Sequence, residues 1–423
     1  MKPTVLCPDL ELGLETKPCR FCGTKLRRTF IDLGMSPLCE TYPAASDFRR
    51  GESYYPLHVY VCDECFLVQL EQYESPQKIF TEYPYFSSYS DSWLQHADHY
   101  CAKMTEQFRL DRNSFVVEVA SNDGYLLQYF VERDVPVLGI EPALNVAKVA
   151  TEKGVPTLVR FFGAPLAEAL VKEGRSADLL LGNNVLAQVP DLNDFVEGLK
   201  ILLKPNGVLT LEFPHLLRLI ERNEFDTIYH EHFSYFSLLT ALRILGAHGL
   251  RVFDVDELPT HGGSLRIYAS RREDDTRAVA PRVQQIVEEE KRASLDQPAG
   301  YEGFALRARQ TKIELVDFLL KATTMGKSVA GYGAPGKSAT LLHYCGITRD
   351  LLAYTVDRSP HKQGRFLPGN HIPIFHPDRI RETRPDYVLI LPWNLKDEIM
   401  EQLQFVRAWG GRFVVPIPKL VVC

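Results

Sequence analysis

The stretch Val116-Val-Glu-Val-Ala-Ser-Asn-Asp-Gly-Tyr125 decides the fold of this chain. A short apolar run, typical of a buried strand, leads into a tight polar turn and then into a segment with a helical pattern. At such a strand–turn–helix junction, backbone N–H groups and the helix dipole meet a ligand. The turn lacks Gly-x-Gly-x-x-Gly, which disfavours a dinucleotide pyrophosphate at this position.

Strand-like runs alternate with helical segments on both sides of this junction, which predicts parallel sheets covered on both faces. Between two such regions, residues 276–325 predict one or two long charged helices, broken near Pro298-Ala-Gly300. The first region is predicted to contain strands at Phe115–Val119, Pro136–Ile140, Ala177–Leu181 and Val208–Phe213. The second is predicted to contain strands near Ser328–Gly331, Leu352–Val356, Tyr387–Leu391 and Phe413–Pro416.

Two Cys-x-x-Cys knuckles, Cys19-Arg-Phe-Cys22 and Cys62-Asp-Glu-Cys65, precede the first α/β region. Four thiolates complete a tetrahedral zinc shell with no open position, so the predicted zinc is structural. A redox pair or buried thiols is the weaker interpretation, because both knuckles fall in one small module. The other five cysteines, at positions 7, 39, 101, 345 and 423, are predicted to be ordinary thiols.

Length and composition limit the class of protein. A chain of 423 residues is long enough for two to four domains, and its net charge of −6 argues against a nucleic-acid partner. Residues 1–14 show no secretion signal, and no apolar stretch is long enough to span a bilayer. We therefore expect a cytoplasmic protein, without membrane or nucleic-acid partners, that acts as a monomer.

Polar side chains follow the next two predicted strands. Glu141 ends the second strand, where an acid can bond ribose hydroxyls, and Asn183 and Asn184 end the third. An acid in the first turn together with one after the second strand is the usual way to hold S-adenosylmethionine. Turn residues without a ligand would explain any one of these positions, but explain three successive strand ends less well.

The segment Asp226-Thr-Ile-Tyr-His-Glu-His-Phe-Ser-Tyr-Phe-Ser237 clusters side chains that move protons near neutral pH. In an extended segment, His230 and His232 would share a face while Glu231 points the opposite way. A metal site is disfavoured, because this is not the His-Glu-x-x-His pattern and no third ligand is evident.

The segment Gly331-Tyr-Gly-Ala-Pro-Gly336 fits Gly-x-Gly-x-x-Gly and, with Lys337-Ser338, also the Walker A pattern. Both patterns imply a strand–turn–helix that cradles phosphate, yet they imply different ligands. Asp357 is suitably placed for a ribose-binding acid in the dinucleotide fold. A Rossmann-like domain with an empty loop is the remaining alternative.

These motifs together resemble the zinc-containing sugar C-methyltransferases, which use S-adenosylmethionine to methylate nucleotide-linked keto-deoxysugars. The match covers nearly the whole chain in one order. It is carried by the two knuckles, Glu118–Gly124, Asn183–Asp191, Asp226–Ser237, Gly331–Lys337, Asp357, Lys362–Gly364 and Leu367–Gly369.

The resemblance implies a multidomain α/β fold. Residues 1–75 would form the small zinc-binding module and residues 76–275 a Rossmann-like S-adenosylmethionine methyltransferase domain. Residues 276–423 would form a C-terminal Rossmann-like domain that completes the nucleotide-sugar site. The expected cofactor residues are Glu118, Ser121, Asn122, Asp123, Gly124, Glu141, Asn183 and Asn184.

The resemblance also implies the chemistry. The expected substrate is a dTDP-linked 4-keto deoxysugar methylated at carbon 3, with His232 as the base and Tyr229 and Glu231 as its helpers. Gln188 stands where the family often has a histidine, so that position has no base here. Predicted substrate contacts are Tyr85, Ser87, Ser88 and Lys337. The alternatives are an NAD(P)H-dependent keto-sugar reductase, a bifunctional methylase–reductase, and a non-catalytic nucleotide-sugar-binding protein.

Overall fold

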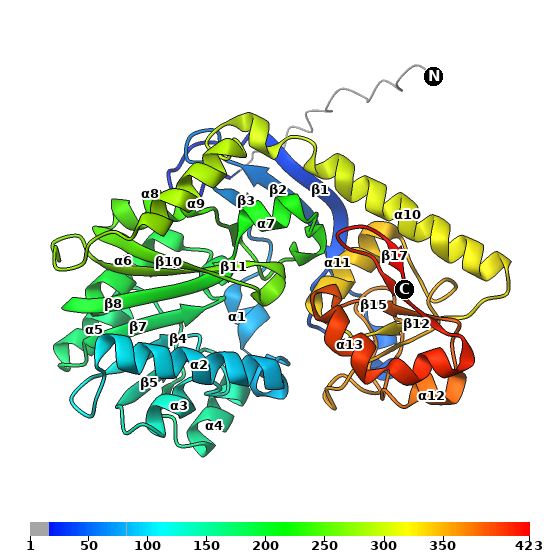
Figure 1. Ribbon diagram of the computed structural model, residues 1–423, viewed down its shortest axis with the longest axis horizontal. Helices are drawn as coiled ribbons and strands as arrows, with labels where there is room; N and C mark the ends of the chain where they lie inside the picture. The colour runs from blue at the N-terminus through cyan, green and yellow to red at the C-terminus, as the bar shows by residue number, and fades with distance from the viewer. Residues whose placement is uncertain (1–16, 82) are drawn as a thin grey trace.

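The structure, a computed structural model, describes residues 17–81 and 83–423. Cys7 and the segment in which no secretion signal is expected lie outside the described residues. Two bodies flank strand β1 (Arg28–Pro37), one built around the central sheet and the other from the C-terminal part of the chain (Figure 1). In the described part of the chain, no helix is long and apolar enough to cross a bilayer.

The cysteine-rich module forms an antiparallel sheet in the order β1-β2-β3-β9. β2 (Tyr54–Val61) and β3 (Val68–Leu70) follow β1 directly in the chain. β9 (Ser234–Tyr235) comes from the distant Tyr-His-Glu-His segment and pairs with β3, a contact that the sequence did not predict. The zinc module therefore holds the end of that segment.

A seven-stranded sheet in the order β10-β11-β8-β7-β4-β5-β6 forms the central body. β4, β5, β7 and β8 confirm the four predicted strands and run parallel. The prediction of a parallel sheet was incomplete, because β10 and β11 form a hairpin whose strand β11 lies antiparallel to β8. The strands are β4 (Val116–Val119), β5 (Val137–Ile140), β6 (Thr157–Leu158), β7 (Ala177–Asn183), β8 (Leu203–Pro214), β10 (Leu250–Leu258) and β11 (Ser264–Arg271).

Helices cover this sheet and lead into its site. β4 is buried at all four residues, as a central parallel strand requires. Helix α2 (Asp91–Phe108) starts at Ser90, whose side chain accepts a hydrogen bond from the Trp93 amide. The other helices on this sheet are α3 (Leu127–Val131), α4 (Leu144–Glu152), α5 (Ala164–Lys172), α6 (Leu192–Leu202) and α8 (Leu238–Ala247). Two further helices pack elsewhere: α1 (Pro76–Phe80) lies against Phe233, and α7 (Leu216–Glu221) lies in the cluster that the zinc module and the C-terminal body share.

The predicted break near Pro298 is confirmed, since it separates helices α9 (Pro281–Arg292) and α10 (Phe304–Thr324). The C-terminal sheet has the order β14-β13-β12-β15-β16-β17, parallel except for β17. Its strands are β12 (Val329–Tyr332), β13 (Thr355–Val356), β14 (Ile374–Phe375), β15 (Tyr387–Ile390), β16 (Arg412–Val415) and β17 (Val421–Val422). Its helices are α11 (Gly336–Cys345), α12 (Arg379–Thr383) and α13 (Lys396–Gln402).

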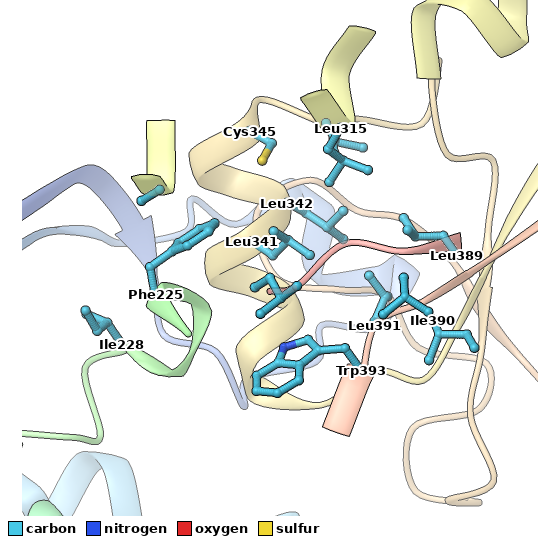
Figure 2. Packing of buried hydrophobic residues seen from close by; sticks show 14 of the residues in the cluster. Phe225, Ile228, Leu315, Leu341, Leu342, Cys345, Leu389, Ile390, Leu391 and Trp393 are labelled. Atoms are coloured by element: carbon cyan, nitrogen blue, oxygen red, sulfur yellow. The ribbon is translucent and has the colours of Figure 1, made fainter. Parts of the chain in front are cut away.

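One hydrophobic cluster joins the C-terminal sheet to the start of the Tyr-His-Glu-His segment. Leu341 and Leu342 of α11 lie between Phe225 on one side and Leu389 on the other (Figure 2). All four side chains are fully buried. The C-terminal body therefore shares a core with the segment that carries the candidate base.

Candidate functional site

A cavity of about 900 Å³ opens between the carboxyl edge of the central sheet and the C-terminal body. Parallel α/β sheets bind ligands at this edge, beyond the ends of their strands. Side chains from the linker before α2 form a further wall. The cavity volume is at the upper end of the range for a small-molecule site, so two ligands can share it.

The turn after β4 has an unusual backbone. Ala120, Asn122 and Gly124 all have positive φ angles, 58°, 48° and 73°. A side chain at Gly124 would also crowd Val155, because a Cβ there would lie 3.1 Å from the Val155 Cγ2. Such left-handed residues bend the backbone sharply between the strand and the following helix, as a ligand-binding turn requires.

Two polar side chains, Glu118 and Ser121, are buried behind this turn and do not line the cavity. Neither makes a hydrogen bond of good geometry among the described residues, although the Tyr125 hydroxyl lies close enough to Glu118 to oppose the rise in its pKa. Gly139 leaves them room, since a Cβ on it would lie 2.4 Å from the Ser121 Oγ. Burial and the nearby Glu141 carboxylate hold the pKa of Glu118 well above its usual range. Glu118 and Ser121 therefore shape the turn from behind, while Asn122 at its tip lines the cavity.

Glu141 lies at the end of β5 and lines the cavity. Its two oxygens accept hydrogen bonds from the backbone amides of Asn122 and Ala143, each at 2.9 Å. Burial raises the pKa of Glu141 to about 7, although those two amides favour the anion. The anion retains lone pairs for further donors, which suits the hydroxyls of a ribose.

Asn183 and Asn184 line the cavity at the end of β7. The Asn183 amide donates to the Tyr125 hydroxyl at 3.3 Å, and the Asn184 amide donates to the His261 Nε2 at 3.0 Å. The side-chain oxygens of both asparagines are buried and have no partner among the described residues. Both oxygens are therefore open acceptors for a ligand.

Of the predicted cofactor residues, Asn122, Glu141, Asn183 and Asn184 line the cavity, whereas Glu118, Ser121, Asp123 and Gly124 do not. Asp123 supports the turn from behind. Its carboxylate accepts from the Ser88 amide and lies 3.3 Å from the Lys153 ammonium. Ser88 also lies outside the cavity, and its hydroxyl accepts from Lys153 at 2.6 Å. Tyr85 and Ser87 do line the cavity, and Asn122 binds the backbone of both.

The Tyr-His-Glu-His segment is a turn, so the expectation that His230 and His232 share a face is wrong. The His232 amide donates to the Tyr229 carbonyl at 2.9 Å, which reverses the chain. His230 points into the zinc module, where its Nε2 donates to the Pro56 carbonyl at 3.2 Å. Tyr229, Glu231 and His232 all line the cavity instead.

His232 is held in the tautomer that a base requires. Its Nδ1 is 3.0 Å from the Thr227 carbonyl oxygen, which only accepts hydrogen bonds, so Nδ1 carries the proton. The Nε2 lone pair is then available on the cavity side. Burial is the main effect that lowers the pKa of His232 to about 4, with the nearby His261 and Lys337 acting in the same direction and the Thr227 carbonyl opposing them. The ring is therefore neutral at pH 7.

Tyr229 and Glu231 surround this imidazole. The Tyr229 ring packs against His232 with centroids 4.1 Å apart. Glu231 accepts from the Tyr83 hydroxyl at 3.0 Å, and burial together with Glu40 raises the pKa of Glu231 to about 8. Glu231 thus retains a proton at pH 7.

The C-terminal body fixes the start of the same segment. The Trp393 indole donates to Asp226 at 2.8 Å, and the Thr340 hydroxyl donates to the Ile228 carbonyl at 2.6 Å. These bonds flank Thr227, whose carbonyl orients His232. The orientation of the candidate base therefore depends on the C-terminal body.

Carboxylates occupy the glycine-rich loop between β12 and α11. Asp357 accepts from the Ala334 amide at 2.7 Å and from the Ser359 amide at 2.8 Å. A Cβ on Gly336 would lie 2.9 Å from the Glu40 Oε1, so Glu40 closes over the start of α11. Burial raises the pKa of Glu40, and the Lys362 ammonium lies 3.8 Å from its carboxyl group and donates to the Ala334 carbonyl at 2.9 Å. Protein side chains therefore fill the loop that the sequence pattern assigns to phosphate.

Lys337 follows the loop and lines the cavity. Its ammonium donates to the Asn394 side-chain oxygen at 2.8 Å and lies 4.4 Å from the centre of the Trp393 ring. Burial lowers the pKa of Lys337, whereas Asp226 and Glu224 oppose that change. Among the described residues Lys337 forms no ion pair within 4.0 Å, so its ammonium can meet an anionic ligand in the cavity.

The four knuckle sulfurs lie within 4.8 Å of one another. Cys19 and Cys65 sulfurs are 3.6 Å apart, and Cys22 and Cys62 sulfurs 3.5 Å, close to the ~3.8 Å that Zn–S bonds of ~2.3 Å imply for a tetrahedron. This donor set fits zinc. Arg20, inside the first knuckle, donates to the Pro190 carbonyl at 2.7 Å, so the module supports the cavity wall.

Sequence reasoning missed several side chains of the cavity. Glu40 and Tyr83 carry no local signal, because they reach the site from the zinc module and the linker. His261 lies in a turn between two strands of the unpredicted hairpin. In the sequence, the two glycines that follow His261 were the one indication of a turn at this position. Gln188 lines the cavity as well, so a side chain unable to act as a base faces the ligands there.

Comparisons with known proteins agree with these features. Family models match a zinc binding domain at residues 19–80, a methyltransferase domain at 93–255 and a C-methyltransferase C-terminal domain at 259–418. The chain is 36% identical to C-methyltransferase NovU from Streptomyces niveus over 401 residues, 95% of each chain.

Solved structures align with the chain only in part. Magnesium protoporphyrin IX methyltransferase from Synechocystis, with 17% identity, is matched over 42% of this chain and 79% of its own at a TM-score of 0.33. An S-adenosylmethionine-dependent methyltransferase from Clostridium acetobutylicum, with 10% identity, is matched over 42% and 92% at a TM-score of 0.34.

The relative and the family models span almost the whole chain, and the donor sets fit S-adenosylmethionine and a structural zinc. The chain is an S-adenosylmethionine-dependent C-methyltransferase and belongs to the family of zinc-containing sugar C-methyltransferases.

Proposed function

We propose that this enzyme methylates a dTDP-linked 4-keto deoxysugar, at carbon 3, through an enolate. The orientation of His232 is the observation that supports this proposal most strongly. Its protonated Nδ1 is tied to the Thr227 carbonyl, which leaves the Nε2 lone pair to the cavity that the cofactor residues also line. A carbon next to a ketone becomes a nucleophile only when a base removes its proton.

His232 Nε2 would take the α-proton, while Tyr229 and Glu231 hold the ring and the sugar in place. S-adenosylmethionine, when bound, supplies an electrophilic methyl group on a sulfonium. Asn122, Glu141, Asn183 and Asn184, which line the cavity, would hold it beside the base. Glu118, Ser121 and Gly124 would shape the turn from behind, and Asp123 would support the turn through Lys153. Holding donor and acceptor in line contributes to the rate in its own right.

The nucleotide part of the substrate is assigned to the side of the cavity formed by the linker and the C-terminal body. Tyr85 and Ser87 line it there, and the Lys337 ammonium forms no ion pair within 4.0 Å among the described residues. A phosphate oxygen is a natural partner for that ammonium. Ser88 would act indirectly, since its hydroxyl binds Lys153 outside the cavity.

A nicotinamide-dependent reductase, alone or combined with the methylase, has less support. Asp357 accepts backbone amides at both oxygens, just as Glu141 does, and it is Glu40 beside Gly336 that distinguishes this loop from an open dinucleotide site. Glu40 occupies the position at Gly336 where a pyrophosphate would lie. A non-catalytic nucleotide-sugar-binding protein would have no need of a base in a fixed tautomer.

A panel of nucleotide keto-sugars, incubated with labelled S-adenosylmethionine, tests the proposal. We expect label in a keto-sugar product and no oxidation of NADPH by the same substrates. Binding without label transfer would instead support the non-catalytic alternative, and substrate-dependent NADPH oxidation would support the reductase. We further propose that the enzyme acts in the cytoplasm, as a monomer, without nucleic-acid or membrane partners.

A further inference from the structure

His261 is a cavity histidine to which the proposed reaction has so far assigned no role. It lies in the turn Thr260–Gly262 between β10 and β11, and its φ angle is 54°. Thr260 donates to Glu212 at 2.9 Å, and Arg222 donates to the Gly262 carbonyl, so the turn is clamped on both sides. Such backbone strain persists only where the surroundings hold it, and it clusters at functional sites.

The hydrogen bond to Asn184 decides the tautomer of this ring. The Asn184 Nδ2 is a donor only, so the His261 Nε2 that lies 3.0 Å away accepts, and Nδ1 carries the ring proton. No described residue accepts a hydrogen bond from that Nδ1. The Trp93 ring lies edge-on at 5.3 Å and restricts rotation of the imidazole. His261 therefore presents one N–H donor to the cavity.

His261 and His232 flank the same short loop after β7. The Asn184 side chain at its start binds His261, and the Ala187 carbonyl near its end accepts from the Phe233 amide at 2.7 Å, next to His232. Both rings line the same cavity. One ring offers a lone pair at Nε2 and the other offers a proton at Nδ1, which is the complementary pair that enolisation requires.

We propose that His261 donates a hydrogen bond from Nδ1 to the ketone oxygen of the substrate and stabilises the enolate that forms when His232 removes the α-proton. This inference rests on the proposed function. In that step the C–H electrons become the new C=C bond, the carbonyl π electrons move to oxygen, and the proton goes to His232. His261 retains its own proton throughout.

The electrostatics of the site support a neutral donor. Burial is the main effect that lowers the pKa of His261 to about 4, with Lys337 and His96 acting in the same direction and Glu212 opposing them, so the ring is uncharged at pH 7. A neutral imidazole kept from protonating in this way can polarise a carbonyl. Removing one such donor from an oxyanion site lowers turnover by about 10²–10³.

Two substitutions distinguish the loss of the Nδ1 donor from a change in the backbone of the turn. His261→Gly removes the ring and suits a positive φ angle, while His261→Asn also tolerates that angle and places an amide N–H near the position of Nδ1. His248→Ala serves as a control, because that ring binds Glu197 and Asn193 outside the cavity. The assay follows solvent deuterium uptake into a dTDP-4-keto-6-deoxy sugar without methyl donor, beside methyl transfer and S-adenosylmethionine affinity by calorimetry.

We expect His261→Gly to lose about 10²–10³ in both exchange and methyl transfer, and only about fivefold in cofactor affinity, because Asn184 loses its bond to the ring. His261→Asn should recover part of the exchange, and His248→Ala should match wild type. Wild-type exchange in His261→Gly would overturn this inference alone, and so would a loss confined to cofactor affinity. A wild-type enzyme that neither exchanges deuterium nor transfers methyl would overturn the proposed function as well.

Discussion

Replacing His232 with Asn should abolish most of the turnover while leaving the fold and the cofactor site intact. The Asn side-chain amide can still donate to the Thr227 carbonyl, which the Nδ1 of His232 reaches at 3.0 Å. The variant lacks only the Nε2 lone pair and the ring. Loss of a general base costs about 10²–10⁴ in rate, or about 2.7–5.4 kcal/mol of transition-state stabilisation.

The loss of stability in His232→Asn should be small and distinguishable from its loss of rate. The lost ring contacts, to Tyr229 at 4.1 Å and Tyr235 at 6.2 Å, are worth about 0.5–1.5 kcal/mol each. His230→Asn is the matched control, since its ring lies in the same segment but binds the Pro56 carbonyl away from the cavity. That variant should lose stability and retain kcat.

The assay measures single-turnover methyl transfer, thermal unfolding and S-adenosylmethionine binding for both variants. We expect a 10²–10⁴-fold lower rate for His232→Asn, with wild-type cofactor affinity. A rate within threefold of wild type would refute His232 as the base. Equal losses in the two variants would show that the segment acts only through the fold.

Three further predictions concern the cofactor, the metal and the glycine-rich loop. Glu141 has a pKa of about 7, so the ribose-accepting anion should grow about tenfold from pH 6 to pH 8, and affinity for S-adenosylmethionine should rise with it. Calorimetry on Glu141→Gln should show weaker binding, by about 10–100-fold, and no such pH dependence. Cys62→Ser should lose bound zinc by elemental analysis and unfold at a lower temperature, whereas Cys423→Ser, an exposed thiol, should do neither. NADPH fluorescence should be unchanged by the protein, because Glu40 and Asp357 occupy the loop, and saturable binding would show that this interpretation of the loop is wrong.

Local pattern was sufficient for the central strands and for the metal module. Val116–Val119 is a fully buried run next to a polar turn, and such a run has few alternatives to a parallel strand. The spacing of the two knuckles likewise predicted four sulfurs that the fold brings together. These features depend on neighbours in the chain, which is why the sequence alone could predict them.

Long-range contacts account for what could not be predicted. The turn at residues 229–232 depends on β9 pairing with β3, and no residue in the segment predicts that pairing. Glu40 comes from the distant zinc module and fills part of the glycine-rich loop, which the sequence pattern assigned to phosphate. His261 enters the cavity only because β11 pairs with β8, so that its turn lies beside Asn184.

The most direct test of the account transfers a ¹³C-labelled methyl group from S-adenosylmethionine to a dTDP-4-keto-6-deoxy sugar and examines the product by NMR. We predict a methyl signal bonded to a ring carbon next to the ketone, with the proton of that carbon lost. A label on oxygen, or its absence from every nucleotide keto-sugar, would contradict base-catalysed carbon methylation.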